Sequence, residues 1–202
     1  MRGLRNGSIT ILSAVVFTML FSAGCSPAHF DVRRYTADDG SLTTRFRSYD
    51  PAFIEGVDAV TRDFQVTGAH HVERSEESRI CNIAVEKRIP EDYRIRYYLI
   101  IIYVGEKSTE FESLSLEVED RHIYLPRDKK IMKEPKLLSD KTVEQEIYYR
   151  VSAGDLRVLA NAHTVAFELE VKVRDEPVKA YLTNRTIKGI KQFVDEHVEE
   201  DA

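Results

Sequence analysis

The chain has 202 residues, a net charge of −5, and 43% hydrophobic against 31% charged residues, which is typical of a globular protein and not of a disordered one. Loss of the first 24 residues removes two arginines and no acid, and leaves a net charge of −7. That charge argues against binding of nucleic acid and against general electrostatic attraction to anionic lipid.

The first 24 residues have the layout of a secretory signal peptide. The layout combines a positive start, an uncharged apolar run and two small residues before a cysteine: Arg2 and Arg5, residues 9–21, and Ala23-Gly24-Cys25. The apolar run is shorter than the roughly 20 residues that a transmembrane helix needs. A permanent membrane helix and an ordinary secreted protein are therefore the alternatives to the interpretation that follows.

The sequence Ser22-Ala23-Gly24-Cys25 resembles the lipobox of bacterial lipoproteins. The resemblance implies cleavage between Gly24 and Cys25, a diacylglycerol on the Cys25 sulfur, and acylation of the new amino group. Two or three acyl chains hold a protein stably on a bilayer. Ser22 departs from the usual Leu. In enterobacterial lipoproteins an Asp after the lipidated cysteine favours the inner membrane, so the resemblance implies that Ser26 favours the periplasmic face of the outer membrane. We expect a lipid-anchored protein of the cell envelope.

The chain divides into a signal peptide at 1–24, a lipidated Cys25 with a polar tether at 25–50, and one globular domain at 51–202. The tether is expected because this stretch is polar, lacks periodicity, and contains Pro27 and Gly40. One alternative stays open within it. Leu42, Thr44 and Phe46 alternate as in a short strand, so part of the tether could dock on the domain.

A period of two predicts strands through most of the domain. Residues 94–105 give the strongest strand, and their apolar side chains on both faces indicate a central strand that is covered twice. The other expected strands share a regular alternation of apolar side chains and lie at residues 64–74, 79–89, 111–120, 122–126, 142–151, 164–175 and 178–182. The charged run around Pro135 predicts a surface loop over 127–141.

Three helices are expected. A helical spacing of apolar residues after Pro51 predicts a short helix over 51–63. Ser152 begins a capping sequence for a second short helix near 154–162. Thr183 or Asn184 caps a C-terminal helix near 184–199, with an apolar stripe of Ile187, Ile190, Val194 and Val198.

This order of elements predicts an α+β fold. We expect an antiparallel sheet of about six to eight strands, partly covered by helices, with a sandwich of two sheets as the alternative layout.

Residues 142–193 resemble the C-terminal half of a class of uncharacterised exported bacterial lipoprotein domains. The matching residues are packing residues and caps: Glu146, Tyr148, Ser152, Asp155-Leu156, Leu159-Ala160, Ala162, Val165, Tyr181 and Phe193. The resemblance implies a shared fold and no particular activity.

The sequence lacks the common motifs of nucleophilic, nucleotide-binding, zinc-binding and dithiol sites, namely GxSxG, GxxxxGKS/T, GxGxxG, HExxH and CxxC. His70 and His71 would point to opposite faces of a strand, so they make a poor metal chelate. Glu168 and Glu170 share a face with basic side chains, as exposed cross-strand pairs do. We expect no catalytic residue, no cofactor and no metal site.

Two further features each have two interpretations. Cys81 is expected to be a small buried apolar residue, with a reactive or intermolecular thiol as the alternative. Tyr98 and Tyr148 could line a groove if they share a face, but packing on or within the sheet is favoured.

The favoured function is that of a non-enzymatic envelope lipoprotein, held to the membrane by the lipid on Cys25, that binds another envelope protein or serves a structural role. The alternative is a lipid-anchored module that binds a small ligand or lipid, which requires a deep apolar cavity. An enzyme of unrecognised type is third, and requires a cleft with perturbed titratable groups. The sequence assigns no ligand-binding residues.

Overall fold

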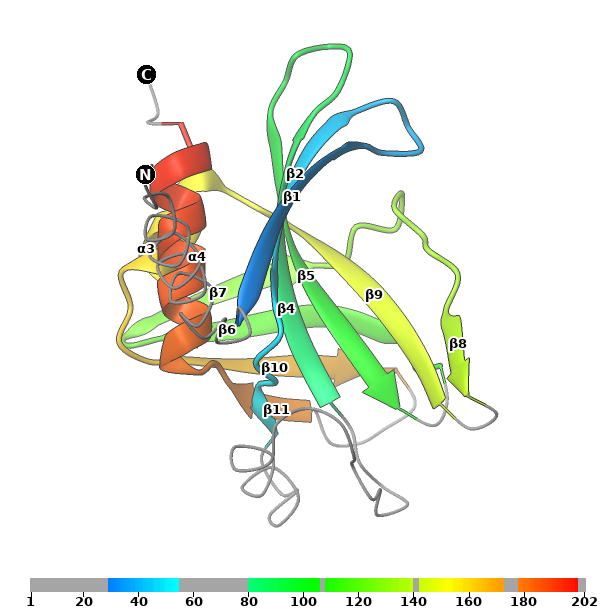
Figure 1. Ribbon diagram of the computed structural model, residues 1–202. Helices are drawn as coiled ribbons and strands as arrows, with labels where there is room; N and C mark the ends of the chain where they lie inside the picture. Colours follow the sequence, from blue (N-terminus) through cyan, green and yellow to red (C-terminus); the bar gives the residue numbers. More distant parts are fainter. Residues whose placement is uncertain (1–28, 55–79, 106–107, 140–141, 173–177, 200–202) are drawn as a thin grey trace, which may run out of the picture.

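A computed structural model describes residues 29–54, 80–105, 108–139, 142–172 and 178–199 (Figure 1). The signal peptide, Gly24 and Cys25 lie outside the described residues, as do His70 and His71. Most of the helix expected at 51–63 and the strand expected at 64–74 also lie outside them.

Six antiparallel strands form sheet A, in the order β1-β2-β4-β5-β9-β8. Their bounds are β1 Phe30–Thr36, β2 Leu42–Ser48, β4 Ile80–Ile89, β5 Arg96–Gly105, β8 Lys136–Ser139 and β9 Thr142–Val151. Five antiparallel strands form sheet B, in the order β3-β11-β10-β6-β7. Their bounds are β3 Phe53–Ile54, β6 Phe111–Val118, β7 Arg121–Pro126, β10 Val165–Val171 and β11 Val178–Tyr181.

Two helices complete the described fold. α3 spans Ala153–Ala160 and begins at Ser152, whose side chain accepts a hydrogen bond from the Asp155 amide. α4 spans Asn184–His197 and begins at Thr183, whose side chain accepts from the Thr186 amide. In both helices the cap satisfies an amide that has no partner within the first turn. Both caps agree with the sequence-based expectation.

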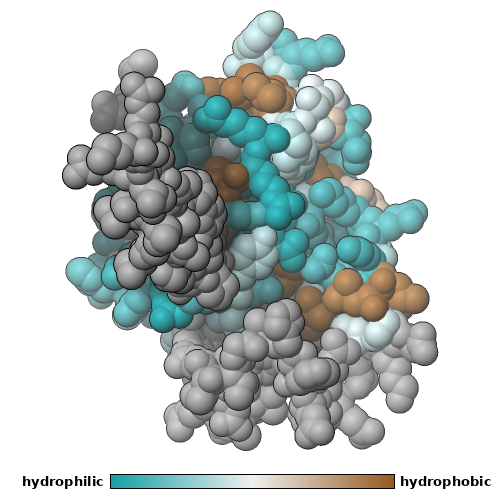
Figure 2. Space-filling view, viewed as in Figure 1, coloured by the Kyte–Doolittle hydropathy of each residue, from teal (hydrophilic) through white to brown (hydrophobic). Residues whose placement is uncertain are grey.

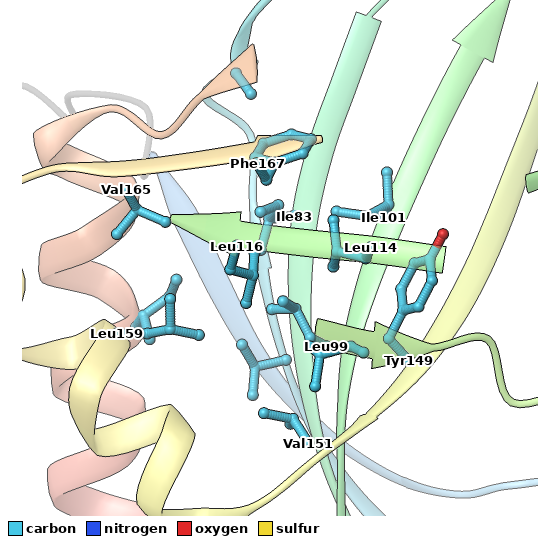
Figure 3. Close-up of a cluster of buried hydrophobic side chains, with 14 of the residues drawn as sticks. Ile83, Leu99, Ile101, Leu114, Leu116, Tyr149, Val151, Leu159, Val165 and Phe167 are labelled. Atoms are coloured by element: carbon cyan, nitrogen blue, oxygen red, sulfur yellow. The ribbon is translucent and has the colours of Figure 1, made fainter. Parts of the chain in front are cut away.

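The main core lies between the two sheets and the helices. Side chains of β4, β5 and β9 meet those of β6 and β10 across this space (Figure 3). Among the side chains that Figure 3 labels, those of sheet A are Ile83, Leu99, Ile101, Tyr149 and Val151. Those of sheet B and α3 are Leu114, Leu116, Leu159, Val165 and Phe167. One face of each sheet is therefore buried against the other, as in the sandwich layout.

Strand β5 is central in sheet A and is buried on both faces, as expected. Leu99 and Ile101 belong to the main core, whereas Ile100 and Ile102 belong to a second apolar cluster on the opposite face. Ile131, from the segment before β8, packs against this second cluster. The outer face of sheet A is thus partly covered by the chain's own residues.

α4 packs closely on the β1–β2 part of sheet A. The rings of Phe46 and Phe193 lie 6.3 Å apart between their centroids. A Cβ atom added at Gly189 would lie 2.6 Å from the Phe46 ring, so only glycine permits this approach. These side chains fill the space between the sheet and the helix.

The α+β class, the antiparallel pairing and both late helices are confirmed. Three expectations are wrong. Within the expected tether, residues 30–36 form β1 and residues 42–48 form β2, and both strands join sheet A beside β4. Strand β2 confirms the alternative of a docked strand at Leu42, Thr44 and Phe46. Residues 53–54 of the expected helix form β3, which pairs with β11. Residues 136–139 of the expected loop form β8. Each correction adds an edge or near-edge strand, where partial exposure weakens the apolar alternation.

Candidate binding surface at two hairpin tips

Two hairpins of sheet A project together at one end of the molecule (Figure 1). One is the β1–β2 turn at residues 37–41, and the other is the β4–β5 turn at residues 90–95. Leu42 pairs with Ile89, so the turns are neighbours. We call residues 37–42 and 90–94 the hairpin tips.

The β1–β2 turn is held by its own backbone and by one aspartate. Gly40 has a φ of +80° and donates to the Ala37 carbonyl over 2.9 Å. Asp39 accepts from the Ser41 hydroxyl and the Ser41 amide. These hydrogen bonds, with smaller help from the charge of Arg88, lower the pKa of Asp39 below its usual value.

The β4–β5 turn contains a strained tyrosine. The Tyr93 amide donates to the Pro90 carbonyl over 2.9 Å, and Tyr93 has a φ of +55°. This backbone conformation favours glycine and is unusual for an aromatic residue. Asp92 supports the turn by accepting from the Arg94 amide and by pairing with Arg96.

The hairpin tips offer two exposed apolar or aromatic side chains beside several carboxylates. Tyr93 is 84% exposed and Leu42 is 55% exposed. The acidic side chains of the tips are Asp38, Asp39, Glu91 and Asp92. Tyrosine combines a large apolar area with a polar end at low entropic cost, and is therefore enriched in binding hot spots.

Below the tips, an ionic network lies on the outer face of sheet A. It consists of Arg45, Glu86, Arg88 and Glu146, and we call it the charge cluster. The fully buried Glu86 carboxylate accepts from Arg45 over 3.2 Å, from Arg88 over 2.9 Å, and from the Tyr35 hydroxyl over 2.8 Å. Every Glu86 oxygen therefore has a charged donor, as a buried carboxylate requires.

Arg88 connects the charge cluster to the tips. Its guanidinium pairs with Glu86 and lies 3.6 Å from Asp39 of the β1–β2 turn. It also lies 5.2 Å from the ring centroids of both Tyr98 and Tyr148, within the range of cation–π attraction. The cluster therefore fixes the base of the hairpins.

The electrostatic environment stabilises the ionised carboxylate of Glu146. Burial raises its pKa, but hydrogen bonds and charge from Arg45, together with Lys133 and the Tyr148 hydroxyl, outweigh burial and lower the pKa to about 2. Burial and the Glu86 charge raise the pKa of Tyr35 to about 12. The Glu146 carboxylate is thus ionised and paired at neutral pH.

Tyr98 and Tyr148 lie on a common face, with ring centroids 6.1 Å apart in an edge-to-face arrangement. Both are buried, so they pack against each other and under Arg88. The favoured expectation of packing is confirmed. Cys81 is fully buried in the main core, as expected. Glu168 forms an exposed pair with Lys179 of the neighbouring strand β11, which agrees with the expected cross-strand pairing.

A groove of about 410 Å³ lies between the β6–β7 turn and α3. Its lining mixes charged and small apolar side chains: Val118, Glu119, Asp120, Arg121, Arg157, Val158, Asn161 and Ala162. Within the described ranges, no cluster of three His, Cys, Asp or Glu side chains has a geometry suited to a metal ion. None of the described helices is long and apolar enough to cross a membrane.

The charge cluster and the hairpin tips were missed by reasoning from sequence. Arg45 lay in the expected tether, and its partners Glu86 and Glu146 stand on two other strands, β4 and β9. The one available signal was the presence of the charged residues Glu86, Arg88 and Glu146 within otherwise largely apolar strands.

Comparison of the chain with models of protein families, with curated proteins and with solved structures gave no match. The resemblance of residues 142–193 to exported lipoprotein domains stays a prediction.

Proposed function

We propose that this protein is a bacterial envelope lipoprotein, anchored through the lipid on Cys25, whose domain binds another envelope protein through the hairpin tips. The proposal assigns it no catalytic activity. The periplasmic face of the outer membrane is the proposed location, on the basis of Ser26.

The position of Cys25 supports the anchor. β1 begins at Phe30, so only residues 26–29 separate Cys25 from sheet A. Five peptide steps reach at most about 18 Å. A lipid on Cys25 therefore holds the domain close to the bilayer, at the end of β1 that is opposite to the hairpin tips. The tips then point away from the membrane, where a partner has access.

The conformation of Tyr93 is the observation that carries the binding role. A residue in the left-handed region costs about 1–2 kcal/mol relative to glycine in that place. The Tyr93 side chain is largely in solvent, so it repays little of this cost in the isolated protein. Strained residues whose side chains are exposed are typical of functional sites.

The close packing of α4 against β2 supports a binding surface over a ligand pocket between these two elements. The module for a small ligand or lipid requires a deep apolar cavity between sheet and helix. Phe46, Phe193 and Ile190 are fully or almost fully buried there, in the close contact that Gly189 permits. The described groove beside α3 has charged walls and lies at the surface.

The anchor is tested by intact mass and by membrane fractionation of the wild type and Cys25→Ala, both produced in a bacterium from the full gene. The wild type should lack residues 1–24, carry the mass of lipid, and sediment with membranes. The Cys25→Ala variant should carry no lipid. The anchor would be refuted if the measured mass of the wild type, like that of Cys25→Ala, equalled the mass calculated for its polypeptide alone.

The binding role is tested by cross-linking in envelope membranes, with a photoreactive residue in place of Glu91. A partner should cross-link to the otherwise wild-type chain and be lost when Tyr93→Gly or Leu42→Ser is added. Tyr124→Gly is the control, because Tyr124 is an exposed tyrosine of β7 on sheet B. Cross-linking that Tyr93→Gly and Leu42→Ser leave unchanged would contradict the proposal.

A further inference from the structure

We propose that residues 127–139, which we call the β8 corner, contact the anionic bilayer that holds the lipid on Cys25. This inference rests on the proposed anchor and adds a second contact, made by side chains, to the same membrane. It concerns the edge of sheet A opposite to β1.

Apolar side chains of the β8 corner are in solvent. Met132 is 77% exposed and Leu137 is 67% exposed, and the neighbouring Leu138 is also exposed. Figure 2 shows hydrophobic side chains where Figure 1 draws β8. Leu137 and Leu138 are adjacent on a strand, so they point to opposite faces of the sheet. A molecule or membrane that covers both Leu137 and Leu138 must therefore approach the edge of the sheet and not one of its faces.

The form of β8 disfavours an added strand as that occupant. β8 has four residues, follows Pro135 directly, begins with Lys136, and shifts register against β9 between Leu137 and Ser139. Short length, proline, lysine and a bulge are the features by which sheet edges avoid pairing with another strand. The corner therefore offers side chains and little regular backbone for pairing.

The local charge favours anionic lipid. Residues 127–139 contain five basic and two acidic residues, a net charge of +3 in a chain of net charge −5. Lys129, Lys130 and Lys136 are exposed and take part in none of the ion pairs among the described residues. A lysine beside an anionic bilayer strengthens binding about fivefold. The negative net charge of the whole chain is a sum over all residues, so it does not exclude a local positive charge at the β8 corner.

The geometry places the β8 corner and the anchor at one end of sheet A. The strand pairings lead from Phe30 across the sheet to Ile147 on β9, whereas Leu137 pairs with Val143 on the same strand. Leu137 therefore lies about four residues, or roughly 13 Å, farther from the hairpin tips than Phe30 does. This offset is less than the roughly 18 Å that separates Cys25 from Phe30 at full extension. A bilayer that holds Cys25 can therefore reach Leu137.

The test uses the mature, lipidated full chain in vesicles of phosphatidylethanolamine and phosphatidylglycerol, or of phosphatidylcholine alone. The environment-sensitive fluorophore NBD is attached at Leu137→Cys or, as a control at the far end, at Tyr93→Cys. Cys81 is buried and does not compete for the label. NBD at residue 137 should shift to the blue and resist an aqueous quencher in the anionic vesicles, whereas NBD at residue 93 should stay in water.

Charge reversal gives the matched comparison. Lys130→Glu with Lys136→Glu should raise the quenching of NBD at residue 137 about tenfold or more. Arg34→Glu with Arg150→Glu changes the net charge equally, outside the hairpin tips and far from Leu137, and should have no effect.

The outcomes separate the two proposals. An intact mass without lipid would overturn the anchor and this inference with it. A lipidated protein whose residue 137 stays open to the quencher in both vesicles would overturn this inference alone. Shielding that depends on protein concentration in detergent, without vesicles, would show that a second copy covers the corner, and would also overturn it.

Discussion

Arg45 of β2 donates to both carboxylate oxygens of Glu146 on β9, over 3.1 Å and 2.6 Å, although β4 and β5 lie between their strands. The strand pairings place Arg45 opposite Arg150, four residues from Glu146 along β9. Three strand spacings and four residues along the strand would separate Arg45 and Glu146 by about 19 Å across a flat sheet. The contact forms because sheet A curls toward its outer face, so that long side chains meet above β4 and β5. The same pair fixes the curl and supports the hairpin tips through Glu86 and Arg88.

The costs of removing the two members of this pair should not be additive. Arg45→Met or Glu146→Leu alone leaves a largely buried charge without its main partner, which costs about 3–5 kcal/mol. The double variant should cost less than the sum of the single variants, with a coupling of about 1–3 kcal/mol in urea unfolding.

The exposed pair of Glu110 and Lys172 is the control for this cycle. Its coupling should stay below about 1 kcal/mol because solvent screens it. Additive costs for Arg45 and Glu146 would show that the ion pair does not hold the curl.

Acid should weaken the fold within a defined pH range because of Glu146. Its pKa of about 2 lies below the value of about 4.3 expected for the unfolded chain. A depressed pKa stabilises the folded state above the unfolded value, and this stabilisation is lost as the pH falls from about 4.5 toward 2. We expect a loss of about 2–3 kcal/mol over that range, measured by urea unfolding at each pH. Glu146→Gln should show a smaller loss, and an identical profile would contradict the assignment.

Gly189→Ala should destabilise the protein although alanine favours helices. The added Cβ would meet the Phe46 ring at 2.6 Å, and this ring is fully buried beside Phe193. We expect a net loss of about 1–2 kcal/mol in thermal or urea unfolding, since overpacking outweighs the gain of about 1 kcal/mol in helix propensity. Gly154→Ala is the control, because its Cβ would meet only the Ser152 hydroxyl at 3.7 Å. That variant should be neutral or more stable.

Tyr93→Gly should stabilise the isolated protein by up to about 1 kcal/mol, because glycine adopts a φ of +55° without strain. Tyr124→Gly, at an exposed position within strand β7, should instead lose about 0.5–1 kcal/mol. Urea unfolding of the two variants compares these signs directly. If Tyr93→Gly stabilises the isolated protein and also loses the cross-link, Tyr93 has a binding role and not a structural one. If Tyr93→Gly destabilises the protein, Tyr93 supports the turn.

Much of the α+β fold follows from local patterns in the chain. The doubly apolar strand β5, the alternation of β10, and the caps Ser152 and Thr183 depend on residues that are close in sequence. The strands β1 and β8 were missed, and β2 was only an alternative, because polar or exposed side chains interrupt their alternation. Their pairing with β2, β4 and β9 depends on partners elsewhere in the chain.

The sequence by itself predicts a lipid site at Cys25, and it determined the antiparallel α+β class and the positions of the late helices, because each rests on a motif or period within a few residues. Only the tertiary structure decided that Arg45 meets Glu146, that Tyr93 and Leu42 share one tip, and that Leu137 stands at an open edge. These relationships depend on strand order and on the curl of sheet A, which join residues up to a hundred positions apart and leave no local pattern.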